Sequence, residues 1–73
     1  MMTELIIRRG ATGQFYVTDS ADPSFELNEI TDAQLLGYLR HRRLVGTTAE
    51  AVIQQFDPEQ KRSIVHVTID RSV

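Results

Sequence analysis

Cysteine is absent from this chain of 73 residues, so neither a disulfide nor a thiolate-bound metal can stabilise its fold. The length allows one domain, over residues 1–73. A hydrophobic core of this size contributes little net stability, and small domains usually need a further stabilising element. We therefore expect strong local folding signals, self-association, or both.

Long apolar segments are missing as well. No run approaches the roughly 20 residues needed to cross a bilayer. The first residues, Met1 to Glu4, have neither the basic start nor the apolar stretch of a signal peptide. The net charge of -2 provides no general attraction to nucleic acid or to anionic membranes. We expect a cytoplasmic protein that does not associate with membranes.

Positive charge is missing from one long segment. Residues 10–39 contain no lysine or arginine, and they hold the acidic residues Asp19, Asp22, Glu26, Glu29 and Asp32. The chain then reads Arg40-His41-Arg42-Arg43, in a stretch without acids. Such sorting can create opposed electrostatic poles in a protein whose total charge is nearly balanced.

The first half of the chain predicts a hairpin followed by an acidic connection. Leu5-Ile6-Ile7 and Phe15-Tyr16-Val17 are β-rich runs around a glycine-containing turn. A three-residue loop, with Gly13 in the left-handed conformation, would pair Ile7 with Val17 and Arg9 with Phe15. Residues 19–29 are expected to form a long polar loop. This loop is either simply solvated or a docking surface for a basic partner.

Two helices and one more strand follow. Thr31 with Gln34, and Thr47 with Glu50, each have the spacing of a capping box at a helix start. Asp57-Pro58 is expected to end the second helix. Leu35, Leu36 and Leu39 form the apolar stripe of the first helix, and Ala49, Val52, Ile53 and Phe56 that of the second. Alternating Val65, Val67 and Ile69 predict a half-buried strand over residues 63–71.

The element order is β-β-α-α-β, which predicts a small two-layer α+β domain. It would contain a three-stranded sheet with an N-terminal hairpin, and both helices would pack on one sheet face. The opposite face would then carry a mixed apolar and polar surface, which is typical of interfaces. We expect this face to form a homodimer, as the most frequent kind of homo-oligomer, or to bind another protein. The predicted interface residues are Ile6, Tyr16, Ile64, His66 and Thr68.

Nucleic-acid binding is the alternative function. Arg40, Arg42 and Arg43 could bind phosphate, although cations at the negative end of a helix dipole are common without any ligand. Two further basic pairs are Arg8-Arg9 and Lys61-Arg62. These pairs would meet at one end of the sheet if the last strand runs antiparallel to the first. Convergence of all three clusters on one surface would favour nucleic-acid binding.

Catalytic and metal-binding motifs are not recognisable. Gly10-Ala11-Thr12-Gly13 lacks the lysine and hydroxyl residue of a phosphate-binding loop and lies between strands. The acids from Asp19 onward do not have EF-hand spacing. His41 and His66 fall on different elements, and no serine lies in a nucleophile motif. We therefore expect a non-enzymatic interaction module without a cofactor.

Overall fold

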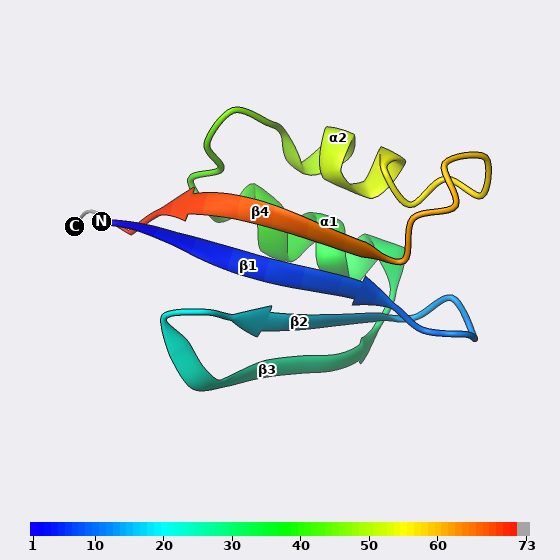
Figure 1. The fold of residues 1–73 in the computed structure, drawn as a ribbon, viewed down its shortest axis with the longest axis horizontal. Helices are drawn as coiled ribbons and strands as arrows, with labels where there is room; N and C mark the ends of the chain where they lie inside the picture. Colours follow the sequence, from blue (N-terminus) through cyan, green and yellow to red (C-terminus); the bar gives the residue numbers. More distant parts are fainter. Residues whose placement is uncertain (72–73) are drawn as a thin grey trace.

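A four-stranded antiparallel sheet, with both helices packed on one of its faces, forms the computed structural model of this protein (Figure 1). The structure describes residues 1–71. The strands lie in the order β3-β2-β1-β4. The elements are β1 (Met2–Arg9), β2 (Phe15–Asp19), β3 (Asp22–Ile30), α1 (Asp32–Arg40), α2 (Ala49–Gln54) and β4 (Ile64–Asp70). The α+β class is confirmed.

The prediction of a three-stranded sheet is wrong, because β3 occupies most of the expected acidic loop. The chain turns sharply after β2, so that Asp19 pairs with Asp22. Phe25 and Leu27 then pack against the core. β3 is an edge strand, where Pro23 is tolerated because one side of the strand needs no backbone donors. Its acidic residues discourage pairing with further strands.

The hairpin register is as predicted. Ile7 pairs with Val17 and Arg9 with Phe15, and Gly13 has a φ angle of 86° at the turn. The direction of β4, which the sequence left open, is antiparallel to β1. Ile6 lies opposite His66 in this pairing. Successive residues of the three strands therefore alternate between the helix-covered face and the opposite face.

The first helix begins at the predicted cap. The Thr31 hydroxyl accepts a hydrogen bond from the Gln34 amide at 3.2 Å, and the Thr31 amide donates to Gln34 Oε1 at 2.8 Å. In the second helix Thr48 is the cap, since its hydroxyl accepts from the Ala51 amide at 3.1 Å. The predicted box at Thr47 is therefore wrong by one position. Starting at Thr48 buries Ala49 and Val52 against the sheet.

Apolar side chains from all layers meet between the sheet and the helices. Phe15 and Phe56 make an edge-to-face contact there, with ring centroids 5.0 Å apart. The buried apolar residues are Leu5, Ile7, Phe15, Val17, Leu35, Leu39, Ala49, Val52, Phe56, Val65, Val67 and Ile69. This core leaves the other face of the sheet without a covering layer among the residues that the structure describes.

One carboxylate is buried on the helix side. Asp19 closes β2 on the same face as Phe15 and Val17, and its side chain is fully buried. Its Oδ1 accepts from the Ala21 amide at 2.9 Å, and its Oδ2 forms an ion pair with Arg71. Asp19 is therefore an internal partner of Arg71 and does not belong to a solvated acidic loop.

Candidate interaction face

The face of the sheet away from the helices is the candidate site, and we call it the outer face. The structure places all five predicted interface residues on it, because their strand neighbours point into the core. Charged and further polar positions share this face. The outer face includes Met2, Glu4, Ile6, Arg8, Tyr16, Thr18, Glu26, Ile64, His66, Thr68 and Asp70.

Apolar groups surround Arg8 on the outer face. Arg8 pairs with Tyr16 on one side and with Ile64 on the other, and Ile6 lies two residues away on the same strand. Ile64 is 50% exposed, and Ile6 and Tyr16 are partly buried. Met2 is 59% exposed and lies six residues from Arg8, at the other end of β1. Leaving large apolar groups in water is unfavourable, and exposed apolar residues that lie together are typical of binding surfaces.

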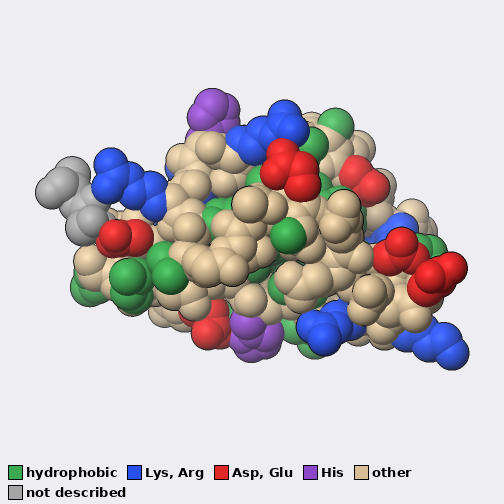
Figure 2. All heavy atoms as spheres, turned by 90° about the horizontal axis from the view of Figure 1, so that it is seen from above, with side chains coloured by type: hydrophobic (Ala, Val, Ile, Leu, Met, Phe, Trp, Pro, Cys, Tyr) green, Lys and Arg blue, Asp and Glu red, His purple; other side chains and the backbone are tan. Residues whose placement is uncertain are grey.

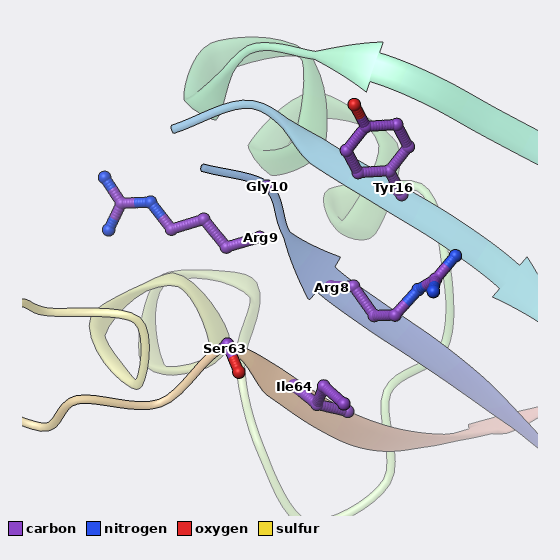
Figure 3. A pocket seen from close by; sticks show the side chains of 6 residues that line it. All are labelled: Arg8, Arg9, Gly10, Tyr16, Ser63 and Ile64. Atoms are coloured by element: carbon purple, nitrogen blue, oxygen red, sulfur yellow. The ribbon is translucent and has the colours of Figure 1, made fainter. Parts of the chain in front are cut away.

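A shallow hollow of about 340 Å³ lies at the Arg8 end of the face (Figure 3). Arg8, Gly10, Tyr16 and Ile64 line it, and Gly10 lets the ring of Tyr16 lie over the turn. A β-carbon at Gly10 would lie 2.9 Å from Tyr16 Cε2, which is too close. Figure 3 shows the Arg8 side chain and the Tyr16 ring on the same side of the view, on neighbouring strands, and the Arg9 side chain on the other side. The hollow is open, and both Arg8 and Arg9 line it beside Tyr16 and Ile64.

A charged pair lies beside Ile6 on the outer face, because His66 is opposite Ile6 and contacts Glu4. His66 Nδ1 lies 2.5 Å from Glu4 Oε1, and both side chains are about half exposed, at 57% and 46%. Such an exposed pair contributes little to stability. The contact with His66 holds the Glu4 carboxylate on the outer face, and Glu4 lies on the same strand as Arg8.

The three basic clusters do not converge. Arg8-Arg9 and Lys61-Arg62 lie at one end of the sheet, where the Arg9 amide donates to the Ser63 carbonyl at 2.9 Å. The cluster at Arg40 to Arg43 lies at the other end, since the Asp70 amide donates to the Arg43 carbonyl at 2.9 Å. Figure 2 accordingly shows separate groups of basic side chains over the surface that it presents.

Several of these arginines already have partners inside the chain. Arg9 Nη1 donates to the Phe56 carbonyl at 2.8 Å, and Arg42 lies 4.5 Å from the centre of the Tyr38 ring. Arg40 donates two hydrogen bonds to Glu50 Oε1, at 2.9 and 2.7 Å. These bonds lower the pKa of Glu50 from its ordinary value of 4.5. Arg62 also donates to Gln55 Oε1 at 3.2 Å, so four of the seven predicted nucleic-acid-binding residues are engaged by the fold.

The described residues give little support for metal binding or for a membrane-spanning helix. Residues 1–71 contain no group of three side chains from His, Asp and Glu that could hold a metal ion. His41 caps the end of α1 and His66 lies on β4. Within the same residues, no helix has the length and apolar character needed to cross a membrane.

No known family model matches this chain, and neither a curated protein nor a solved structure matches it. The outer face is therefore interpreted from its own geometry.

Proposed function

We propose that this protein is a small, non-enzymatic interaction module that binds a second copy of itself through the outer face. The observation that supports the proposal is the apolar group of Ile6, Tyr16 and Ile64, which no element of residues 1–71 covers. The polar residues around these three match the apolar centre and polar border of protein interfaces. We place this activity in the cytoplasm.

Self-association also fits the energetics of a chain of this size. Its core holds 12 buried apolar residues, and no disulfide supplements them. Covering the outer face would remove further apolar surface from water at roughly 25 cal/mol per Å². A ligand that binds only the folded state stabilises it, and a second copy acts in the same way.

Sedimentation equilibrium between about 5 and 500 µM tests this proposal, because small interfaces give weak dimers. Ile64→Glu places a charge in the apolar group and should weaken dimerisation by about tenfold or more. Val45→Glu is the matched control. Val45 is similarly exposed, at 42%, but lies on the segment beside the edge of β4.

Each outcome has a distinct meaning. A wild-type protein that stays monomeric throughout the range would refute the proposal. A larger effect from Val45→Glu than from Ile64→Glu would move the interface to the edge of β4.

Nucleic-acid binding remains the alternative, supported by the meeting of Arg8-Arg9 with Lys61-Arg62 at one end of the sheet. Asp57 and Glu59 lie in the loop that precedes Lys61 and reduce the positive charge there. We expect no salt-dependent binding of a random single-stranded oligonucleotide in fluorescence anisotropy. Binding that disappears in the double variant Lys61→Ala with Arg62→Ala would instead favour the alternative.

A further inference from the structure

We propose that two copies pack outer face to outer face about a two-fold axis. The axis lies between the two sheets, parallel to them, runs perpendicular to the strands and crosses β1 at Ile6. Arg8 of each copy then meets the partner's Glu4. This inference rests on the proposed self-association and specifies its geometry. It predicts which side chains meet and which charges decide the orientation.

The spacing of charges along β1 is the first argument. Glu4 and Arg8 each lie two residues from Ile6, on the same face, which is about 6.7 Å in either direction. A two-fold axis through Ile6 and perpendicular to β1 reverses the strand direction in the second copy. Ile6 then faces the partner's Ile6, and Arg8 faces the partner's Glu4 at two symmetric places. Interfaces with two-fold symmetry need this kind of self-complementarity.

The competing orientation is unfavourable. An axis parallel to the strands would keep their direction and place Arg8 over the partner's Arg8 and Glu4 over the partner's Glu4. Like charges that face each other across an interface weaken it strongly, whereas opposite charges fix the register. The two β1 charges, Glu4 and Arg8, therefore favour the perpendicular axis.

The hollow supplies a second argument. In this arrangement β1 of one copy runs antiparallel over β1 of the other. Gly10 therefore lies over the partner's Met2. Met2 is 59% exposed, and the hollow beside Gly10 is open, with Tyr16 and Ile64 on its walls. A flexible thioether side chain fills irregular apolar space well. The arrangement would thus cover the exposed apolar residues at both ends of the face.

The size of the face sets the expected strength. Four strands spaced by about 4.8 Å, each contributing a length of about six residues, give a footprint of roughly 400 Å² per copy. A standard stable interface buries about 800 Å² per partner. The dimer should therefore be weak and reversible, with a dissociation constant on the order of 10–100 µM.

Charge reversal at the two positions provides the test. The single variants Glu4→Arg and Arg8→Glu should each dimerise at least about tenfold more weakly than the wild type at low salt. Mixed in equal amounts, they should form a heterodimer at least as tight as the wild-type dimer. In that mixed pair, both symmetric contacts join opposite charges.

A matched pair of variants controls for general attraction between oppositely charged proteins. Glu59→Arg and Arg43→Glu change the net charge by the same amounts, but both positions are exposed and lie away from the outer face. Their mixture should not associate more tightly than the wild type. His66→Asn controls for the loss of the His66–Glu4 contact in Glu4→Arg.

The outcomes separate this inference from the proposed function. If the wild type dimerises and Ile64→Glu prevents it, but the two charge variants do not combine, the two-fold arrangement is refuted and the interaction face stands. If the wild type does not dimerise at all, both proposals fail. Circular dichroism and thermal unfolding of each variant confirm that it is folded before it is compared.

Discussion

Replacing Arg71 with methionine should reveal how strongly the fold depends on the buried carboxylate of Asp19. The side chain of Asp19 is fully buried, whereas that of Arg71 is 39% exposed and also donates to Thr3 Oγ1 at 3.0 Å. Breaking a fully buried ion pair by removing one partner costs about 3–5 kcal/mol. Since Arg71 is partly in water, we expect a loss of about 2–3 kcal/mol in the free energy of unfolding.

This loss is large relative to the total. A cysteine-free domain of this size has a stability of only about 3–5 kcal/mol. Urea unfolding followed by circular dichroism at a protein concentration of a few micromolar, where the dimer is dissociated, measures the change.

Asp19→Asn should be milder, at about 1 kcal/mol, because the amide retains an acceptor for the Ala21 amide. Arg43→Met removes an exposed arginine as a control. A loss below about 0.5 kcal/mol for Arg71→Met would show that the buried carboxylate does not need its partner.

The remaining predictions concern pH, the backbone and the dimer. Because the bonds from Arg40 lower the pKa of Glu50, they stabilise the fold above the ordinary pKa of 4.5 and lose this effect as the pH falls through the lowered value. In urea unfolding, the wild type should therefore have a larger free energy of unfolding than Glu50→Gln at pH 7. This difference should vanish at pH values below the lowered pKa of Glu50. Gly13→Ala should cost about 1 kcal/mol at its φ of 86°, whereas Gly37→Ala inside α1, with nothing near the new methyl group, should stabilise by about 0.5–1 kcal/mol. The proposed axis places Glu26 opposite its own copy, so Glu26→Gln should tighten the dimer about two- to threefold at low salt, as measured by sedimentation equilibrium.

Local patterns predicted much of the fold. The hairpin register could be predicted because only a three-residue loop keeps Ile7 and Val17 on one face. The start of α1 could be predicted because the side chains of Thr31 and Gln34 each accept a hydrogen bond from the other residue's backbone amide. Both features depend on residues close in sequence, where spacing decides the geometry.

The additional strand could not be predicted by the same means. Between Asp22 and Ile30 only Phe25 and Leu27 alternate, and the positive φ of 55° at Glu29 interrupts the period before Ile30. Pairing with β2, rather than the β-propensity of the segment, makes it a strand. The short turn at residues 20–21 was the one local signal that could have indicated it.

The buried ion pair was missed for a different reason. Asp19 follows Phe15 and Val17 at alternate positions, and Arg71 follows Val67 and Ile69 in the same way. Strand alternation alone therefore directs both side chains to the helix face. Their charge suggested solvent instead, since lone buried charges are rare. The ion pair makes the burial possible, and it forms because β2 and β4 pair with β1 from its two sides. No local sequence pattern contains this long-range contact between Asp19 and Arg71.

The charge sorting that stands out in the sequence therefore has mostly structural causes. Asp19 is paired inside the protein, Asp32 lies at the positive end of α1, and Arg40 is bonded to Glu50. Two charges on β1 are different, because neither lies in the sorted segment. Glu4 and Arg8 sit symmetrically around Ile6 on a face that nothing in the described chain covers. Glu4 contacts His66, but both side chains are about half exposed and Arg8 is exposed, so this short alternation on β1 can reach a second copy and is the better basis for its recognition.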